Sequence, residues 1–246
     1  MNAERVVAIL RAIGLALVVL FGIACLLLLP LMFFVAQHAV AGGPDLFTSV
    51  DSGVRGEPIN VVLPDGNLSA VVAGMEAQGW IIVPTFSPNN EHTWTFDVAS
   101  GVTPISPRLF DGAIQAVALE GPNSTVFSRH HARFWMVNGT VYGAVSYDAD
   151  VTVIMQGFVP LPTHVIGQDI DAERDAVGKT LAEALNRTMS YEENAAPALY
   201  ADNGAGSWYY TDGEVLVLSK NASPTTLFLA ARRAYFRFLG LLLDRL

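Results

Sequence analysis

Cysteine and positive charge are both scarce in this sequence. Its 246 residues contain one cysteine, Cys25, so no disulfide framework is expected. Between Gly42 and Ser223 there are 8 basic and 21 acidic residues. A surface of that sign repels the phosphates of a nucleic acid. Nucleic acid is therefore excluded as a partner.

The sequence also lacks the short motifs that identify common catalytic sites. It has no HExxH zinc motif and no glycine-rich phosphate loop after a predicted strand. Neither Ser128 nor Ser146 lies in the GxSxG context of a nucleophile elbow. These absences favour a protein that is not an enzyme and needs no cofactor, and they leave open whether a metal is bound.

Charge is absent from the 25 residues between Ala12 and Ala36. A helix needs about 20 apolar residues to cross a bilayer. One alternative is a buried core helix. Another is a cleavable signal peptide, because Ala-Val-Ala at 39–41 suits a signal peptidase, but the apolar part of such peptides spans only about 7–15 residues. We therefore predict a transmembrane anchor within residues 1–41.

Basic residues flank this apolar run on one side only. Arg5 and Arg11 precede it, and the next basic residue after it is Arg55. Basic residues beside a transmembrane helix favour the cytoplasmic side. We therefore expect a single-pass protein of the inner membrane, with a cytoplasmic N-terminus and a periplasmic domain.

After the anchor, the chain divides into three predicted parts. Residues 42–56 are expected to be a linker, residues 57–223 a domain, and residues 224–246 a separate C-terminal helix. Within the domain, apolar spacing predicts helices over 68–78 and 170–189, and other runs, such as 93–98, predict strands. This content indicates an α+β fold with a mostly antiparallel sheet and a few packed helices, preceded by one transmembrane helix.

Two hairpins are predicted in the domain. Asn138-Gly139 separates two alternating runs over 127–148, which is a strong hairpin signal. A two-residue turn there pairs Arg129 with Asp148 and His131 with Ser146. The second predicted hairpin joins 208–210 to 214–218 through Asp212-Gly213.

Alternation along the first hairpin separates a core face from a polar face. His130 lies at the end of the core face, and we expect a hydrogen-bonded core histidine there. His131 lies on the polar face and is the better functional candidate; an exposed histidine without a role is the alternative. The polar patch consists of Arg129, His131, Arg133, Ser146 and Asp148.

A second group of polar candidates follows the hairpin. His164 precedes an acidic run that includes Asp171. Histidine and carboxylate groups can bind a divalent metal or transfer protons. The alternative is that the acidic side chains cap the start of a helix. The candidate catalytic residues are therefore His131, Asp148, His164 and Asp171.

The C-terminal segment is a basic amphipathic helix by its pattern, with arginines on one side and leucines on the other. Such a helix suits a membrane interface or a partner groove; the alternative is that it packs on its own domain. Small residues in the anchor also permit close helix packing. The expected contacts with membrane or partner are Gly14, Gly22, Pro30, Arg232, Arg233, Phe236, Arg237 and Leu243.

An ordered series of short segments resembles the LssY C-terminal domain family over about residues 56–218. The segments are PINVV at 58–62, GW at 79–80, RHHARFW at 129–135, GAVSYD at 143–148, THVI at 163–166, DAERD at 171–175, NGAG at 203–206 and YTDG at 210–213. The resemblance implies a bacterial domain beside membrane segments, which some proteins fuse to phosphatase-like membrane domains. This chain departs from those fusions, because it has one predicted transmembrane helix and no such membrane domain.

Three functions are compatible with this organisation. The first is a non-catalytic accessory subunit of a larger membrane-protein complex, with the membrane and other subunits as partners. The second is a membrane-tethered hydrolase of a lipid or phosphate ester, which requires the four candidate residues to converge in one cleft. The third is a module that binds envelope lipid or glycan, which requires an apolar or aromatic groove.

Overall fold

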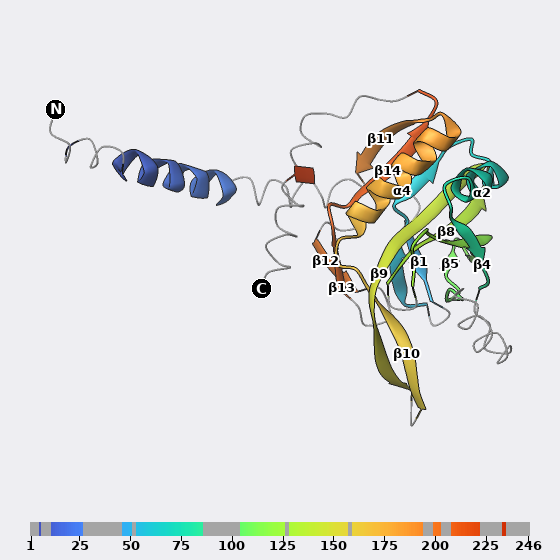
Figure 1. Cartoon of the computed structure of the whole chain (residues 1–246). Coiled ribbons are helices and arrows are strands. Elements are labelled where there is room, and N and C mark those ends of the chain that lie inside the picture. Colours follow the sequence, from blue (N-terminus) through green and yellow to red (C-terminus); the bar gives the residue numbers. More distant parts are fainter. Residues whose placement is uncertain are drawn as a thin grey trace. The chain divides into compact units, whose positions relative to one another are not determined.

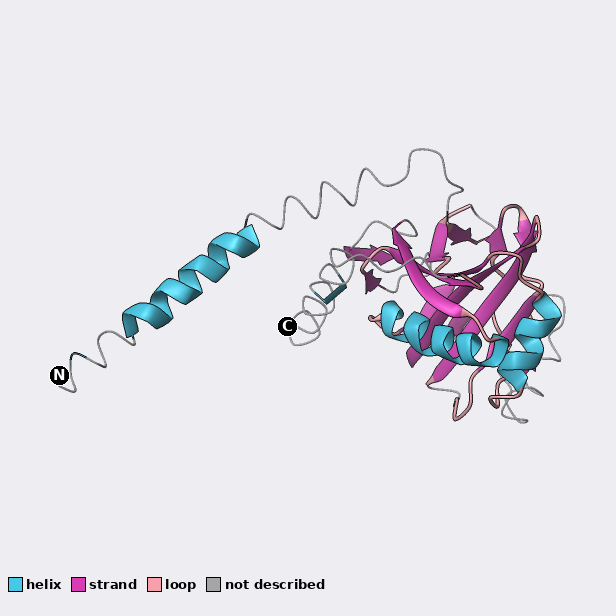
Figure 2. Cartoon of the chain, turned by 90° about the horizontal axis from the view of Figure 1, so that it is seen from above, coloured by secondary structure: helices cyan, strands magenta, loops and turns pink. Residues whose placement is uncertain are grey.

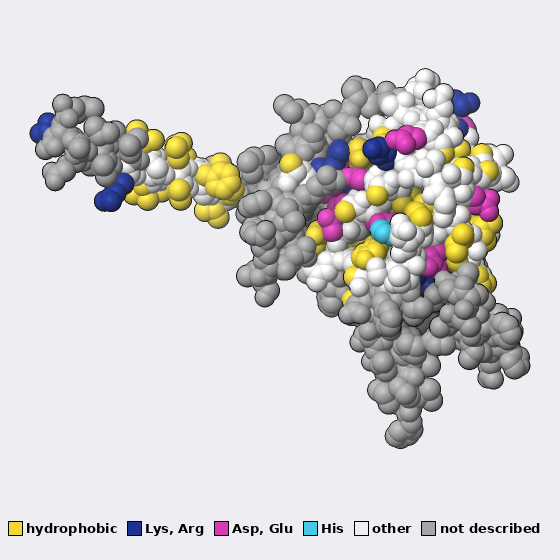
Figure 3. All heavy atoms as spheres, viewed as in Figure 1, with side chains coloured by type: hydrophobic (Ala, Val, Ile, Leu, Met, Phe, Trp, Pro, Cys, Tyr) yellow, Lys and Arg dark blue, Asp and Glu magenta, His cyan; other side chains and the backbone are white. Residues whose placement is uncertain are grey.

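The computed structural model describes residues 5, 11–26, 46–50, 53–85, 104–125, 128–156, 159–193, 199–202, 208–221 and 233–234. The chain divides into two compact units, residues 1–41 and 42–246. In the first unit, residues 11–26 form a helix with exposed apolar side chains, including Leu15 and Phe21 (Figure 3). Within the described ranges, no helix is both long enough and apolar enough to cross a membrane.

The second unit is built on an eight-stranded, mostly antiparallel sheet among its described residues (Figure 1). The strand order is β11-β14-β3-β9-β8-β7-β4, and β10 pairs with β9 beyond this path. The strands are β3 (Val61–Leu63), β4 (Ile81–Val83), β7 (Val117–Glu120), β8 (Arg129–Val137), β9 (Thr140–Gln156), β10 (Val159–Ile166), β11 (Thr188–Glu193) and β14 (Glu214–Ser219). One pair, β14 with β3, is parallel. The predicted α+β class is confirmed.

Two helices, α2 (Leu68–Glu76) and α4 (Ile170–Leu185), pack on one face of this sheet (Figure 2). Apolar side chains from both layers form the main core, for example Met75 of α2, Phe134 of β8 and Leu181 of α4. Asp169 caps α4 by accepting a hydrogen bond from the Ala172 N–H group. The helix ends at Leu185, and the left-handed conformation of the next residue, Asn186, turns the chain into β11, so the helix is shorter than the predicted 170–189.

A second sheet packs against the first through its other face. It has the order β2-β1-β5-β6, with β1 (Phe47–Ser49), β2 (Arg55–Pro58), β5 (Leu109–Phe110) and β6 (Ala113–Ile114). Phe110 of β5 and Trp135 of β8 meet edge to face in a separate apolar cluster. Residues 42–56 therefore do not form only a linker. Thr48 is buried and its hydroxyl donates to the Glu57 carbonyl, which joins β1 to β2.

The first predicted hairpin is confirmed with its register. Arg129 pairs with Asp148, and His131 pairs with Ser146. Asn138 and Gly139 both have positive φ angles, of 49° and 80°, as a tight two-residue turn requires. β9 is longer than predicted, because it continues past the hairpin to pair with β10.

The second predicted hairpin is wrong. β13 (Trp208–Thr211) pairs with β12 (Leu199–Asp202) in a small separate sheet, whereas β14 pairs with β11 and β3. The Asp212 N–H group donates to the Asp171 carboxylate, and Asp212 accepts from Arg174. These contacts hold the turn against α4, so the chain passes from one sheet to another. The predicted strand over 93–98 lies outside the described residues.

Candidate functional site

The polar patch of the hairpin lies between the two sheets. All five of its side chains are buried, and His131 is only 1% exposed. The Arg129 Nε group donates to Asp148 Oδ2 at 2.7 Å, and His131 Nε2 lies 3.1 Å from Asp148 Oδ1. The alternative of an exposed histidine is therefore wrong, because the second sheet covers this face.

Residues from the second sheet complete the group. Arg133 donates to Glu57 of β2 at 2.7 Å, and Arg108, just before β5, lies 3.8 Å from the same carboxylate. Glu120 of β7 lies directly opposite His131, so it brings a further buried carboxyl group to this face. We name the buried polar cluster as Glu57, Arg108, Glu120, Arg129, His131, Arg133, Ser146 and Asp148. The cluster contains three arginines and three carboxyl groups.

The bonds around His131 decide whether Ser146 can be activated. The Arg133 guanidinium donates to His131 Nδ1 at 3.1 Å, which places the imidazole proton on Nε2. Ser146 Oγ and Asp148 Oδ1 both lie 3.1 Å from that same Nε2 atom. A catalytic triad needs the serine and the carboxylate on opposite ring nitrogens. The three residues therefore form a structural network, without a base free to take the Ser146 proton.

The electrostatics of the cluster favour its ionised form. Burial opposes ionisation of Asp148, but the interaction and hydrogen bond with His131, followed by Arg129, keep the pKa of Asp148 below its usual range. At Glu57, burial raises the pKa, but the charges of Arg133 and Arg108 lower it by more, so the pKa of Glu57 is below its usual value. Burial lowers the pKa of Arg133 to about 10, although the negative charge of Glu57 acts to raise it. The ion pairs thus stay charged at neutral pH.

Asp171 belongs to a different group, on the helical face. Fully buried Arg174 of α4 donates to Asp171 at 3.2 Å and to Asp212 at 2.8 Å, and it also contacts Asp175. Asp171 further accepts from the Thr211 hydroxyl. Burial, opposed by Arg174 and reinforced by the charge of Asp212, raises the pKa of Asp171 to about 7. This Arg174 cluster joins α4 to the turn before β14.

The four catalytic candidates are therefore not brought together as a group. His131 and Asp148 are in contact, while Asp171 lies with Arg174. The backbone of His164 is in β10, paired with Val151, and its side chain lies outside the described residues. Across the described parts of the chain, no three His, Cys, Asp or Glu side chains are arranged to hold a metal ion.

His130 is not a core histidine, which corrects the sequence prediction. Its side chain is 42% exposed, and Nδ1 lies 2.8 Å from Glu173 Oε2 of α4. The imidazole ring also packs on the Tyr147 ring, with 4.8 Å between the two ring centres. Burial raises the pKa of Glu173, although the hydrogen bond with His130 acts to lower it. A surface pocket of about 430 Å³ lies beside this pair.

Arg233 makes its described contacts within its own domain. Its Nε group donates to Glu214 of β14 at 3.0 Å, and its guanidinium lies 3.6 Å from the Tyr191 ring of β11. Arg233 therefore packs on its own domain. Gly14 and Gly22 lie in the N-terminal helix. The remaining predicted contacts, Pro30, Arg232, Phe236, Arg237 and Leu243, lie outside the described residues.

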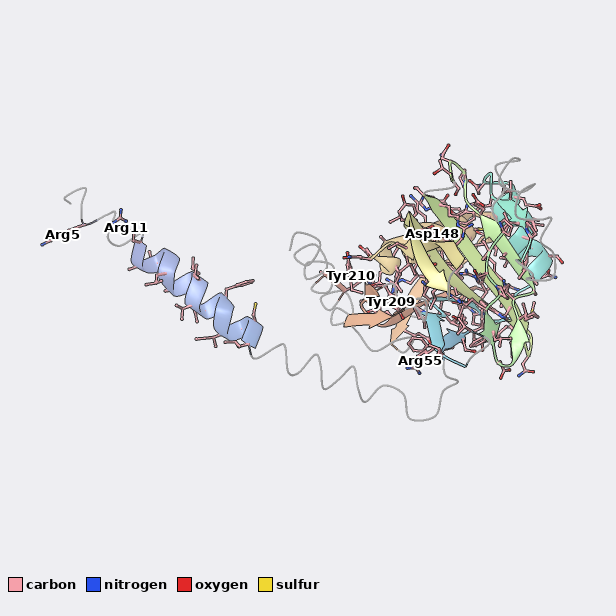
Figure 4. All side chains as sticks on the ribbon, turned by 90° about the horizontal axis from the view of Figure 1, so that it is seen from below. Arg5, Arg11, Arg55, Asp148, Tyr209 and Tyr210 are labelled. Carbon is pink, nitrogen blue, oxygen red and sulfur yellow. The ribbon has the colours of Figure 1, made fainter. Side chains whose placement is uncertain are left out.

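Sequence reasoning missed two features of the site. Glu57, Arg108 and Glu120 were not among the predicted site residues, and Glu57 directly follows the predicted linker over 42–56. It also missed a cleft of about 450 Å³ at one end of the second sheet, lined in part by Phe47, Arg55, Phe110 and Tyr142. Figure 4 shows Arg55 at the outside of the domain and Asp148 among the packed strands. The Asp111-Gly112 turn signal was the available clue to the cleft.

A family model described as LssY C-terminus matches residues 41–215, which are most of the chain. The match covers the strands and helices that carry the buried polar cluster, the Arg174 cluster and the cleft. No curated protein and no solved structure matches this chain.

Proposed function

The chain belongs to the LssY C-terminus family, and from that premise we propose that it is a non-catalytic accessory subunit of a larger membrane-protein complex. The observation that carries this proposal is the state of the polar candidates. His131 and Asp148, two of the four catalytic candidates, are buried between two sheets and bonded to each other, with Ser146 beside them. They stabilise the fold instead of facing a substrate.

An enzyme needs a reacting group that a substrate can approach. Both ring nitrogens of His131 have partners, and Asp148 is held by Arg129 and His131. Asp171 is likewise bonded to Arg174, Thr211 and the Asp212 N–H group. The hydrolase is therefore a weaker candidate than the accessory subunit.

The proposal includes a membrane anchor within residues 1–41 and a periplasmic domain. It is supported by the uncharged run from Ala12 to Ala36, by Arg5 and Arg11 before it, and by the exposed apolar side chains of the helix over 11–26. We expect protease added to intact spheroplasts to digest the domain. Protection in spheroplasts, with digestion in inverted membrane vesicles, would reverse the orientation.

Variants of the full-length chain separate a subunit from a hydrolase. His164→Ala and Ser146→Ala remove two possible reacting groups and spare the buried ion pairs. We expect both variants to co-purify with the same membrane proteins as the wild type, and deletion of residues 225–246 to weaken that association. The proposal fails if the wild type turns over p-nitrophenyl phosphate or p-nitrophenyl butyrate, and His164→Ala abolishes turnover while association is unchanged.

A further inference from the structure

The cleft at the end of the second sheet is lined by residues from three connections between paired strands. The lining residues at these places are Gly53 between β1 and β2, Asp111 in the Asp111-Gly112 turn between β5 and β6, and Asn138 in the Asn138-Gly139 turn between β8 and β9. None of its lining residues belongs to the buried polar cluster. Its volume of about 450 Å³ lies in the range of roughly 300–1,000 Å³ that is usual for small-molecule sites.

Aromatic side chains form the walls of the cleft. Phe110 is packed beneath it against Trp135, and the Tyr142 ring lies 5.0 Å from the Phe110 ring at an angle of 46°. Phe47 contributes a third ring, with the Arg55 guanidinium 3.8 Å from its centre. Because Phe110 is almost fully buried in the apolar cluster, these rings have a fixed support.

The rim combines polar side chains of different kinds. Asp111 offers hydrogen-bond acceptors, Arg55 offers donors, and Asn138 offers both. One carboxylate and one guanidinium leave no net charge at the rim. Asp111 and Asn138 have φ angles of 50° and 49°, so each is held in a tight turn beside a glycine. Such preorganisation lowers the entropy lost on binding.

We propose that this cleft binds a short neutral oligosaccharide, a role beyond that of an accessory subunit. A sugar ring has apolar C–H faces that pack on aromatic rings, and hydroxyl groups that pair with planar amide, carboxylate and guanidinium groups. A phosphorylated headgroup requires an excess of basic side chains, which the balanced Arg55 and Asp111 do not supply. An acyl chain requires a wholly apolar pocket, whereas this lining alternates rings with polar groups.

The test uses the full-length chain in nanodiscs, because glycosidic detergents would occupy a sugar site. Trisaccharides of glucose, mannose, galactose and N-acetylglucosamine are titrated by calorimetry, with saturation-transfer NMR to locate the contacted protons. We expect at least one of them to bind with a Kd below about 1 mM. Tyr142→Ala removes a wall, and Asp111→Asn keeps the left-handed turn but loses the carboxylate; each should weaken binding at least about tenfold.

Matched variants make the result specific. Tyr142→Phe keeps the ring and should retain most of the affinity. Ile82→Ala changes an exposed side chain of β4, outside the cleft, and should leave the Kd unchanged. If Tyr142→Ala does not fold, as judged by its melting curve, Asp111→Asn carries the test. The proposal is overturned if no sugar gives a saturable binding curve, or if Ile82→Ala weakens binding as much as the cleft variants do. It is also overturned if phosphatidylglycerol nanodiscs or a neutral peptide bind at this cleft more tightly than the sugars.

Discussion

His131 illustrates how the meaning of a residue depends on which atoms surround it. The sequence places a serine, a histidine and an aspartate on one face of the predicted hairpin, which is a pattern compatible with catalysis. The guanidinium of Arg133 donates to the imidazole Nδ1 atom, so the ring can only offer its proton from Nε2. That single contact changes a possible base into a hydrogen-bond donor that holds Asp148.

The ion pair between Arg133 and Glu57 should dominate the stability of the cluster. In Arg133→Met, the buried Glu57 carboxylate loses its closest partner. Removal of one member of a buried pair costs about 3–5 kcal/mol. We expect a loss of that size in the free energy of unfolding of the detergent-solubilised chain, measured by tryptophan fluorescence in urea.

Two further variants serve as controls for this pair. Arg187→Met removes an exposed hydrogen bond to the Asp65 carbonyl and should change the unfolding free energy by less than about 0.5 kcal/mol. Adding Glu57→Gln to Arg133→Met should recover part of the loss, because no carboxylate is then left unpaired. An Arg133→Met protein as stable as the wild type would show that the pair does not support the fold.

Glu214 should make the stability depend on pH near neutrality. Burial, together with the charge of Asp212 and against Arg233, raises the pKa of Glu214 to about 7. Because the folded pKa is above the usual glutamate value, this contribution to stability is full at acidic pH and declines as the pH rises through about 7. In Glu214→Gln, the unfolding free energy should therefore decrease less between about pH 5 and pH 8 than it does in the wild type.

The remaining slope in that variant is expected from Asp171, whose pKa is raised to a similar value. Exposed Glu183→Gln on α4 is the control and should leave the wild-type profile intact. If Glu214→Gln and the wild type lose stability with identical slopes, Glu214 does not titrate in this range.

At the scale of single elements, local sequence signals can predict a turn and the register of its two strands, but they do not report pairings between distant strands. The Asn138-Gly139 turn fixed the register of β8 and β9, because a two-residue turn allows only one pairing. The same kind of signal at Asp212-Gly213 predicted a hairpin that does not form. β14 instead pairs with β11 and with the parallel strand β3. β3 lies more than 150 residues earlier in the chain, and no local pattern reports so distant a pairing.

The packing of α4 on β14 depends on one glycine. A Cβ atom on Gly178 would lie 1.8 Å from Leu216 Cδ2, and Leu216 is fully buried. Gly178→Ala should therefore displace the helix and lower the unfolding free energy by about 1–3 kcal/mol, although alanine favours helix formation. Lys179→Ala, at the next and exposed position, is the control. A Gly178→Ala protein with unchanged or higher stability would contradict this packing.

At the scale of the whole molecule, one missed element explains most of what the sequence failed to predict. Residues 47–56 were assigned to a linker and no strand was predicted over 109–112, because the strands there have only two to four residues each. Without the sheet that they form, the polar face of the hairpin was compatible with an exposed histidine. With it, the same face is an interior whose charges are paired, and its outer end becomes an aromatic cleft.

The central claim is that this chain works as a subunit and not by itself. The most direct measurement crosslinks intact cells, solubilises the membranes, and determines the mass and polypeptide composition of the particle that contains the full-length chain. We predict a particle well above the 26.4 kDa of the chain, with the same other membrane polypeptides at fixed stoichiometry in the wild type, His164→Ala and Ser146→Ala. A particle that contains this chain alone, as a monomer or a homo-oligomer, would contradict the claim.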